Sequence, residues 1–510
     1  MFVRRKKNKS GIISIQIIDK SAGKYKMVET VGSSSDPETI ERLFSKANKR
    51  IEVLTGQNKL PFNRLAEADW VNTFLHGIER LELVGPEMLL GKLYNEIGFD
   101  EIKDDLLRHL VIARLAYPAS KLKTVDYLYQ YKGIEIDINK IYRYLDKLQK
   151  QQMQRIQAIS YEHTRKVLGN RISIVFYDVT TLYFEAEDED DLRKIGFSKD
   201  GKHQQPQIVL GLLVSSGGYP LAYEIFEGNT FEGHTMIPVI EAFKTKYKLK
   251  QLVIVADAGL MSDKNISSLK LQGFKYIIGG RIKNETDIVK KQILAMNLKD
   301  GKSKVITKPD GQRLIVSYAT QRAKKDAYNR QRGIAKLEKA VTSGKLTKKQ
   351  LHNRGYNKYL KMDGEVTIAI DYSKLAKEKK WDGLKGYITN TEFSKEEIIE
   401  NYKQLWMIEK TFRISKTDLR IRPVYHYVKR RIEAHICIAF IACKIYKELE
   451  RQLAEKKSEL SPEKAIDILK TMHALTFITP HSNTKYTRLL IKTEAQKILI
   501  DLFDLSWVSQ

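Results

Sequence analysis

Cysteine is scarce in this chain: its 510 residues include two, Cys437 and Cys443. Both lie in one apolar stretch, which excludes a disulfide framework and a cysteine-rich zinc site and fits a reducing cytoplasm. We expect both in the core. No apolar run reaches the ~18 residues of a membrane span. The basic start, Met1–Lys7, resembles that of a signal peptide, but Gln16 and Asp19 interrupt the apolar stretch that follows. We therefore expect a cytoplasmic protein without a membrane partner.

Acidic residues are the second shortage. The chain has 62 Asp and Glu against 89 Lys and Arg, a net charge of +27. This excess is large for an enzyme of small molecules and indicates a polyanionic partner, most simply nucleic acid. A generally lysine-rich proteome is the alternative explanation. The sequence also lacks a cofactor motif of the Gly-x-x-x-x-Gly-Lys-Ser/Thr kind, which further disfavours a small-molecule enzyme.

The length predicts several domains. A chain of 510 residues exceeds one ordinary core, and 42% hydrophobic residues suffice for real cores. We expect a basic arm with a β-hairpin and a helix, a helical DNA-binding region, a first part of an α/β core, a partly β insertion, a second part of the core, and a helical tail. Their predicted ranges are 1–60, 61–168, 169–283, 284–385, 386–450 and 451–510.

The N-terminal part offers two candidate DNA contacts. The arm Arg4–Lys7 could follow phosphates, or it could be a solvated terminus. Behind it, 12–18 and 26–31 read as a hairpin. Further on, Ala119–Tyr131 and Asn139–Gln149 are compatible with a helix-turn-helix, with Asp137 capping the second helix. Plain bundle packing is the alternative. The side chains that the second helix would offer to DNA are Asn139, Lys140, Tyr142, Arg143 and Lys147.

From residue 171 onward the pattern becomes mixed α/β. Strands followed by alternating strands and helices imply a mixed sheet flanked by helices. A strongly basic helical stretch is expected at 322–354, a helix at 430–455, and a mostly helical tail at 456–510. The predicted helices of the sheet region are 234–246 and 263–271. The predicted strands are 172–178, 180–185, 207–214, 251–257, 274–280, 303–307, 313–319 and 365–370.

One long helix is predicted over 394–417. Ser394 and Glu397 form a capping box, and Pro423 marks the far limit. Helical periodicity gives this segment two neighbouring faces. The polar face carries Tyr402, Trp406, Glu409, Arg413 and Lys416. The apolar stripe, which could bury against a sheet, carries Ile398, Leu405, Ile408, Phe412 and Leu419. A basic surface helix with a minor Glu409–Arg413 ion pair is the alternative.

Three carboxylates are candidates for metal chemistry. Asp178 and Asp257 each end an almost wholly apolar strand, where a carboxylate is costly unless it meets water, a cation or a donor. Either alone could simply cap a turn. With Glu409 on a helix beside the sheet, however, three hard oxygen ligands could converge, a set that suits Mg²⁺ or Mn²⁺. Two such ions can clamp an in-line phosphoryl displacement.

These residues resemble the signature of the DDE transposases, with a ribonuclease H-like, retroviral-integrase-like fold. More narrowly, the chain resembles the bacterial insertion-sequence transposases with a Tyr-x2-Arg-x3-Glu-x6-Lys signature, which here reads Tyr402-x2-Leu405-x3-Glu409-x6-Lys416. The two aspartates lie in Phe-Tyr-Asp178-Val-Thr-Thr and Val-Ile-Val-Ala-Asp257-Ala-Gly. Further pieces are Gly-Asn-Thr at 228–230 and Arg-Pro-Val-Tyr-His at 422–426. The resemblance covers 170–445, with an insertion matching 281–385.

The resemblance implies a chemistry and a partner. Asp178, Asp257 and Glu409 would be catalytic and hold two Mg²⁺ ions, for which Mn²⁺ can substitute, while Tyr402 and Lys416 would contact backbone phosphates. The partner would be double-stranded DNA, namely the inverted-repeat ends of the insertion sequence and the target, bound by a homodimer in the synaptic complex. A bacterial or archaeal, nucleoid-associated protein is expected. The reaction would be strand cleavage followed by strand transfer.

The match departs from the family in one position: the signature arginine is Leu405 here. Arg413 could take over its phosphate contact. Some relatives stack a splayed base on an aromatic ring; Trp406 and Trp381 are candidates here, although we expect both to pack in the core. Two histidines carry weaker predictions. His234 is expected to cap a helix or support the site, and His435 to be a satisfied core residue.

Two other functions remain compatible with the sequence. One is a catalytically inactive, DNA-binding descendant; the intact acidic trio argues against it. The other is a metal-dependent nuclease that cuts without joining strands, which an assay for strand transfer would separate from a transposase.

Overall fold

The structure is a computed structural model that describes residues 1–21, 23–55, 64–198, 201–202, 204–260, 262–343, 346, 355–363, 367–479 and 483–505. The described chain forms two compact units. Unit 1 comprises Met1–Arg80 and Thr476–Thr487, and unit 2 comprises Leu81–Leu475 with Arg488–Gln510. None of the described helices is long and apolar enough to span a membrane.

Unit 1 is built on a small antiparallel sheet ordered β1-β2-β3, with β1 Phe2–Lys7, β2 Ile13–Asp19 and β3 Lys26–Ser34. Helix α1 Pro37–Thr55 packs on it around Ile15 and Ile17. Helix α2 is Arg64–His76. The predicted hairpin is confirmed as β2–β3. The basic arm is not a frayed terminus: it forms strand β1, in which Arg5 pairs with Glu41 at 2.7 Å.

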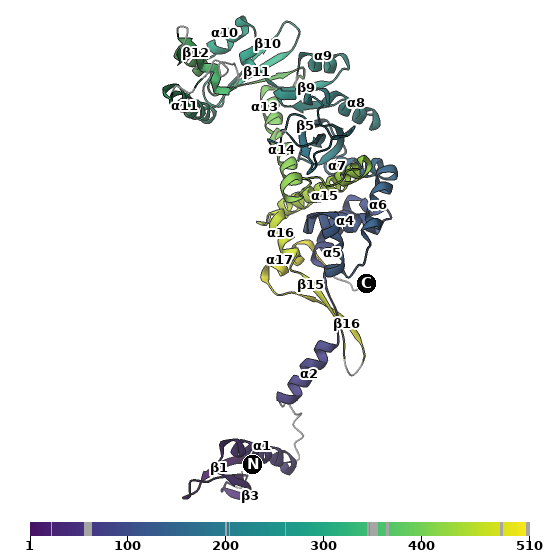
Figure 1. Ribbon diagram of the computed structural model, residues 1–510, viewed down its shortest axis with the longest axis vertical. Helices are drawn as coiled ribbons and strands as arrows, with labels where there is room; N and C mark the ends of the chain where they lie inside the picture. Colours follow the sequence, from purple (N-terminus) through teal and green to yellow (C-terminus); the bar gives the residue numbers. More distant parts are fainter. Residues whose placement is uncertain are drawn as a thin grey trace. The chain divides into compact units, whose positions relative to one another are not determined.

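Unit 2 contains an eight-stranded sheet ordered β10-β11-β14-β9-β8-β5-β6-β7 (Figure 1). Strands β5, β6 and β7 form an antiparallel meander, and β8 and β9 add to β5 in parallel. This confirms the predicted mixed sheet flanked by helices. Its strands are β5 Ile174–Tyr183, β6 Gln207–Ser215, β7 Pro220–Glu227, β8 Val253–Ala256, β9 Lys275–Gly280, β10 Ser303–Thr307, β11 Arg313–Tyr318 and β14 Leu384–Thr389.

Helices cover both faces of this sheet and extend beyond it. A separate small core joins α11 to the pair β12 Leu360–Asp363 and β13 Thr367–Ile370. The helices are α3 Lys92–Ile97, α4 Asp105–Ala116, α5 Lys121–Lys132, α6 Ile138–Gln151, α7 Met153–Val167, α8 Met236–Lys246, α9 Asp263–Leu271, α10 Asp287–Ala295, α11 Thr320–Thr342, α12 Tyr372–Lys379, α13 Lys395–Lys403, α14 Leu405–Arg413, α15 Lys429–Glu455, α16 Pro462–Leu469 and α17 Glu494–Phe503.

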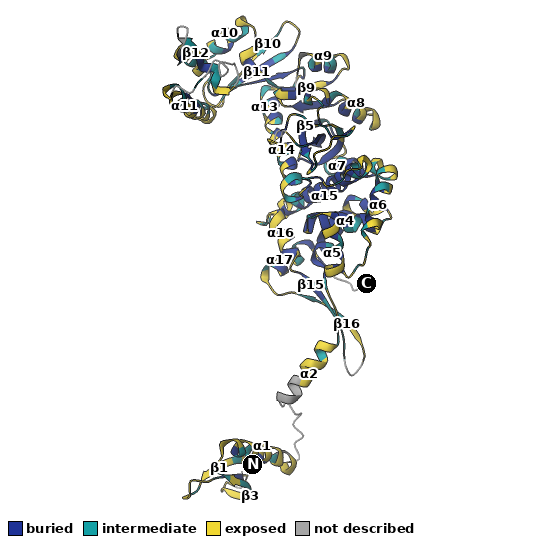
Figure 2. Cartoon of the chain, viewed as in Figure 1, coloured by how far each residue is buried: buried dark blue, intermediate teal, exposed yellow. Residues whose placement is uncertain are grey.

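The alternation of side chains along the strands defines the two faces. Phe176, Val255 and Ile277 belong to the core shared with α14 and α15, whereas Tyr177 and Ile254 belong to the core shared with α8 and α9. Helix α15 lies between β7 and the N-terminal helices α4 and α6, and it is buried along most of its length (Figure 2). Cys437 and Cys443 are buried within it, as predicted.

Four features differ from the sequence prediction. The strands predicted at 172–178 and 180–185 are one strand, β5, because its pairing with β6 continues from Val175 to Tyr183. Strand β7 was missed. The tail contains two strands besides helices, β15 His473–Ile478 and β16 Lys485–Leu490, in a sheet ordered β16-β15-β4 with β4 Ile78–Leu83. The basic helix ends at Thr342. Residues 344–345 and 347–354 of that prediction, and 365–366 of the last strand, lie outside the described residues.

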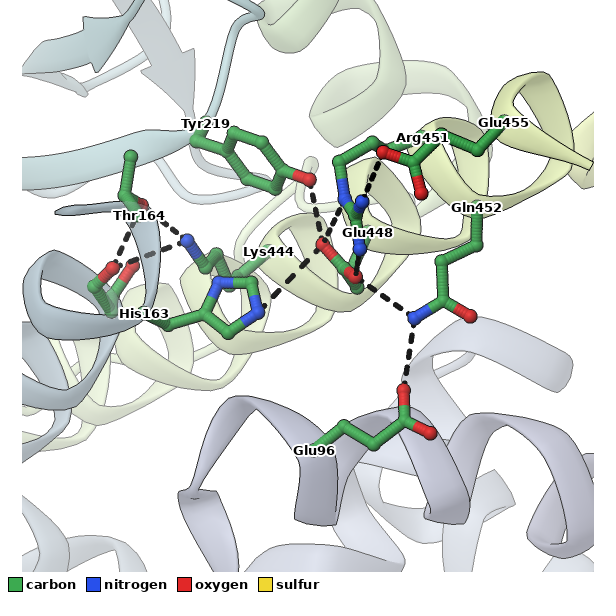
Figure 3. A network of polar contacts seen from close by, with 10 residues as sticks. Glu96, His163, Thr164, Tyr219, Lys444, Glu448, Arg451, Gln452 and Glu455 are labelled. Carbon is green, nitrogen blue, oxygen red and sulfur yellow. Dashed lines mark hydrogen bonds and ion pairs between the residues drawn. The ribbon is translucent and has the colours of Figure 1, made fainter. Parts of the chain in front are cut away.

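A buried polar network fixes α15 against α7 and β7 (Figure 3). Glu448 accepts a hydrogen bond from the Tyr219 hydroxyl at 2.6 Å and pairs with Arg451. One helical turn earlier, the Lys444 ammonium donates to the Ser160 carbonyl at 3.1 Å and to Thr164. These charges are satisfied inside the protein, which is the condition for keeping them there.

Two partly buried histidines, His163 and His426, predict a pH dependence of stability. Burial, together with Lys444, lowers the pKa of His163 to about 4, and burial beside Lys121 lowers that of His426 to about 3. Both histidines take up protons in the unfolded chain near pH 6.5, but not in the folded chain. The free energy of unfolding should therefore fall between about pH 6.5 and 4, by roughly 1.4 kcal/mol per pH unit for each histidine. Urea unfolding at several pH values in this range should show that the free energy of unfolding of His163→Phe falls less steeply with pH than that of wild type. An unchanged pH dependence would contradict the assignment.

Candidate active site

Asp178 and Asp257 are neighbours at one edge of the sheet. The parallel pairing of β5 with β8 ends at Tyr177 opposite Ala256, so each aspartate is the next residue after that last pair. Residues in register on adjacent strands lie about 4.8 Å apart and point to the same side. Asp178 is therefore not at a strand end, as predicted, but at the end of the pairing of β5 with its parallel neighbour. The two carboxylates are brought together.

The helix that carries Glu409 packs on the same face. Helix α13 contacts β8, β9 and β14, and α14 contacts β5. The predicted helix is broken once, at Gln404, between α13 and α14, and it ends in a π-helical turn, Ile414–Asp418. The predicted capping box is present at Ser394 and Glu397. The predicted apolar stripe is fully buried: Ile398, Leu405, Ile408, Phe412 and Leu419.

Tyr402 is an internal partner of Asp257. Its side chain is 5% exposed, and its hydroxyl donates to the Asp257 carboxylate at 2.9 Å. Burial and the Asp257 charge raise the pKa of Tyr402, so the hydroxyl stays protonated and can donate. Gly279 makes this contact possible, because a Cβ there would lie 2.5 Å from the Tyr402 oxygen. Tyr402 thus orients Asp257, and its contact with a backbone phosphate stays a prediction.

Lys385 is a site residue that the sequence analysis missed. Strand β14 runs antiparallel to β9, with Gly386 opposite Gly280, so Lys385 enters the sheet at the edge of the two aspartates. Its ammonium lies 4.4 Å from the centre of the Tyr402 ring. Burial and Arg322 lower the pKa of Lys385, while Asp257 and Glu409 act against this shift. Lys385 therefore lies close enough to interact electrostatically with both acids.

Basic residues continue this edge beyond Lys385. Arg281 follows β9 and donates to the Ala258 carbonyl at 2.8 Å, and Arg322 lies in the first turn of α11, directly after β11. This edge of the sheet therefore presents two carboxylates, from β5 and from the end of β8. Beside them it presents three cations: Arg281 after β9, Lys385 on β14 and Arg322 after β11. Sequence alone could have found this row only if the antiparallel direction of β14 had been predicted.

The remaining residues of the predicted polar face lie on the outside of α14 and its π-helical turn. Glu409 and Arg413 are exposed, and Lys416 is half-buried. Trp406 is 53% exposed, with the Lys410 ammonium 5.8 Å from its ring, so the expected core packing is wrong for it. Trp381 does pack partly buried against the core, as expected.

The candidate ligands are carboxylate oxygens, which hard divalent cations prefer. Two of them, those of Asp178 and Asp257, are neighbours. Within the described residues, however, no three side chains of His, Cys, Asp or Glu are close enough together to hold one ion. Glu409 is therefore not joined to the two aspartates in a closed three-ligand cluster. Lys385, which interacts with both Asp257 and Glu409, occupies this side of the site.

The second predicted DNA contact is a helix pair that packs as part of unit 2. Helices α5 and α6 confirm the two predicted helices, and Asp137 caps α6. Arg143 and Lys147 are both exposed on α6; Lys147 pairs with Asp104 at 3.0 Å. Tyr142 is half-buried, with the Arg431 guanidinium 5.0 Å from its ring.

Of the two histidines with predicted roles, His234 lies in a turn that contacts the turn Ala258–Leu260 directly after Asp257, whereas His435 lies in α15. His234 is exposed in the short helical turn before α8, with Phe231 against its ring at 5.4 Å. His435 is 6% exposed, and its Nε2 contacts the Ile421 carbonyl oxygen at 3.0 Å. Its Nδ1 has no hydrogen-bond partner among the described residues, so the prediction of a satisfied core histidine is wrong in that respect.

Two transposases of low sequence identity are among the solved structures to which this chain is similar. A piggyBac transposase, in a synaptic complex with hairpin DNA, is 8% identical with a TM-score of 0.38; the alignment covers 80% of this chain and 81% of that one. The Mos1 transposase, in a paired-end complex with the left transposon end, is 11% identical with a TM-score of 0.16, covering 47% of this chain and 66% of that one. No curated protein matches.

Comparison with protein families gives a direct match. The family model described as "Transposase DDE domain" matches residues 169–443. This range contains Asp178, Asp257 and Glu409 and spans more than half of the 510 residues. The chain belongs to the DDE-domain family of DNA transposases.

Proposed function

We propose that this transposase cuts and joins DNA at the edge formed by β5 and β8, with Asp178, Asp257 and Glu409 as its catalytic residues. One observation carries the proposal: the two aspartates are adjacent in register, on the sheet face against which the Glu409 helix packs. Carboxylates gathered beside a row of cations suit phosphoryl transfer, because the acids can hold metal ions while the cations neutralise phosphate charge.

Asp178, Asp257 and Glu409 would hold two Mg²⁺ ions, with Mn²⁺ as a substitute. Bound there, the ions supply Lewis-acid stabilisation of the attacking and leaving oxygens. The chain's own contribution is orientation. Tyr402 fixes one Asp257 oxygen through its hydrogen bond, and Lys385 lies where a phosphate held near the acids would meet a cation. Because Lys385 is partly buried, its charge acts in a poorly solvated setting and is worth more than in bulk water.

The proposed reaction has two steps. In the first, water attacks the phosphorus at the end of the element, the P–O3′ bond breaks, and a 3′-hydroxyl and a 5′-phosphate result. In the second, that 3′-hydroxyl attacks a phosphorus of the other strand or of the target, so one P–O bond forms and one breaks. The DNA partners are the inverted-repeat ends and the target. We further propose a homodimer on paired ends, in a bacterial or archaeal nucleoid.

The testing experiment is incubation of purified protein with Mg²⁺ and the DNA that flanks this gene, followed by analysis of nicked and joined products. Wild type should nick at inverted-repeat ends and join them to a second duplex, and Glu409→Gln should do neither. Nicking without joining would favour a metal-dependent nuclease. DNA binding without cutting by either protein would favour an inactive, DNA-binding descendant, and cutting by Glu409→Gln would refute the assigned residues.

Lys416 gives a prediction about affinity. If Lys416 contacts a backbone phosphate, Lys416→Ala should weaken binding to the element end and reduce the slope of log K against log salt by about one unit, because one fewer counterion is released. Fluorescence anisotropy at several salt concentrations measures this slope. Lys403→Ala is the matched control, since Lys403 is exposed on α13 and pairs with Glu400. Equal slopes for the two variants would rule out the contact.

A further inference from the structure

A cavity of about 950 Å³ lies in unit 2 beside the active-site helix. It is bounded by the start of α5, by the chain that follows the π-helical turn after α14, and by α16. Its volume is within the range of small-molecule binding sites, roughly 300–1,000 Å³. Six basic side chains line it: Arg114, Lys121, Lys123, Arg420, Arg422 and Lys470.

Two of these cations are buried without a carboxylate. Arg114 and Lys121 are each 5% exposed. Among the described residues, the Arg114 guanidinium donates only to the backbone carbonyls of Leu419 and Arg420, both at 3.4 Å, which is long for such a bond. No hydrogen bond or ion pair joins the Lys121 ammonium to any residue that the structure describes. A buried charge normally requires a partner, so this pair of cations points to a missing anion.

The other titratable side chains of the cavity leave the positive charge of Arg114 and Lys121 without a counterion. His426 and His435 also line the cavity, and Arg114 and Lys121 act to lower the pKa of both. Two of the three carboxylates of the lining have partners: Asp467 pairs with Lys470 at 2.8 Å, and Glu463 accepts a hydrogen bond from the Tyr446 hydroxyl. The third, Asp418, is half-buried, and burial and Glu463 raise its pKa.

The backbone at the start of α5 also favours an anion in the cavity. Ser120 is the N-cap of α5, and residues 120–123 line the cavity, so the N-terminal end of a twelve-residue helix faces it. A helix N-terminus favours negative charge through its unpaired N–H groups and its dipole. Burial and Arg114 lower the pKa of Lys121, and an anion placed between these two cations would reverse that shift.

We propose that this cavity is a binding site for a phosphate group, held by the side chains of Arg114 and Lys121. The chemistry admits two sources, a phosphate of the DNA strand and free inorganic phosphate. The strand is favoured by position. The lining residues from Thr417 onward directly follow Lys416, and Val424 is bridged to Phe184, six residues beyond Asp178 along the same chain.

This position sets an expected site on the DNA. Six residues of strand span about 20 Å, which corresponds to roughly six base pairs of duplex. The cavity would therefore hold a backbone phosphate about six nucleotides from the bond that is cut. This assignment of the source rests on the proposed function, whereas the phosphate site itself does not.

The test compares wild type with Lys121→Met, which keeps the length of the side chain and removes its charge. Lys150→Met is the control, because Lys150 is an exposed lysine of α6 outside the cavity lining. The first measurement is the melting temperature in sodium phosphate against sodium chloride at equal ionic strength. The second is the salt dependence of binding to the inverted-repeat duplex, followed by a scan with single methylphosphonate substitutions.

In chloride, Lys121→Met should melt above wild type, because it removes an uncompensated buried cation. A merely structural lysine would give a lower melting temperature. Phosphate should raise the melting temperature of wild type and of Lys150→Met but not that of Lys121→Met. If DNA is the source, Lys121→Met should also lose about 0.9 of the salt slope, and one methylphosphonate should weaken wild type but not this variant.

A phosphate effect with an unchanged salt slope would support the site with free phosphate as its source. The proposal is overturned if Lys121→Met responds to phosphate and to DNA as Lys150→Met does. Should Lys121→Met not fold, Arg114→Met is read by the same two measurements. If wild type neither binds nor cuts the repeat, the proposed function fails, but the melting temperatures in phosphate still show whether the cavity binds phosphate.

Discussion

Asp257→Asn should lower strand cleavage by about 10³-fold or more while DNA binding stays the same or tightens slightly. Losing a metal ligand removes several kcal/mol of transition-state stabilisation, and each 1.36 kcal/mol is tenfold in rate. Binding depends on the basic surface, which the substitution leaves intact and which gains from the loss of one negative charge. Asp178→Asn and Glu409→Gln should behave in the same way.

Cleavage of the inverted-repeat duplex and its binding affinity should be measured on the same preparations. Glu396→Gln is the matched control for Glu409→Gln, because Glu396 lies earlier in the same helical segment and its side chain is 71% exposed. It should retain wild-type cleavage. The assignment would be abandoned if the three acidic variants lost binding in proportion to cleavage, since this would indicate damage to the fold or the DNA surface instead of to the chemistry.

The largest effect on stability is expected for Glu448→Ala. The Glu448 side chain is 1% exposed and binds the Tyr219 hydroxyl, Arg451 and Gln452 (Figure 3). Its removal leaves the Arg451 charge without its buried partner, and breaking such a pair costs about 3–5 kcal/mol. Urea unfolding should show this loss as a lower midpoint, provided the slope of the transition is unchanged.

Arg451 supplies its own control. It also pairs with Glu455, whose side chain is 61% exposed. Glu455→Ala should cost less than about 1 kcal/mol, because water replaces an exposed ion pair at little loss. Similar costs for the two variants would mean that the network does not hold α15 in place.

Local patterns in the sequence were sufficient to predict the start and the buried face of the helix that carries Glu409. Its capping box and its apolar stripe depend on spacings of three and four residues, which a single sequence displays directly. The same is true of the apolar strand before Asp257 and of the parallel–antiparallel character of the sheet, which follows from the order of strands and helices.

Non-local pairing decided what these patterns could not. Asp178 was expected at a strand end, yet it lies within β5, because one neighbour of β5 stops there while the other continues to Tyr183. The hydrogen bond from Tyr402 to Asp257 is non-local in the same way: helical periodicity puts Tyr402 on the polar face, but only the pairing of strands brings Gly279, with no side chain, next to its hydroxyl.

By itself, the sequence determined the family, the mixed sheet and the candidate acids, because each is encoded in residue types at short, regular separations. Only the tertiary structure brought Lys385 near Asp257 and Glu409, since the direction of β14 depends on pairing with β9, a strand more than a hundred residues earlier in the chain. It alone also buried Arg114 and Lys121 around one cavity. Whether a charged side chain has a partner depends on residues that are distant in the sequence, so a single sequence does not show it.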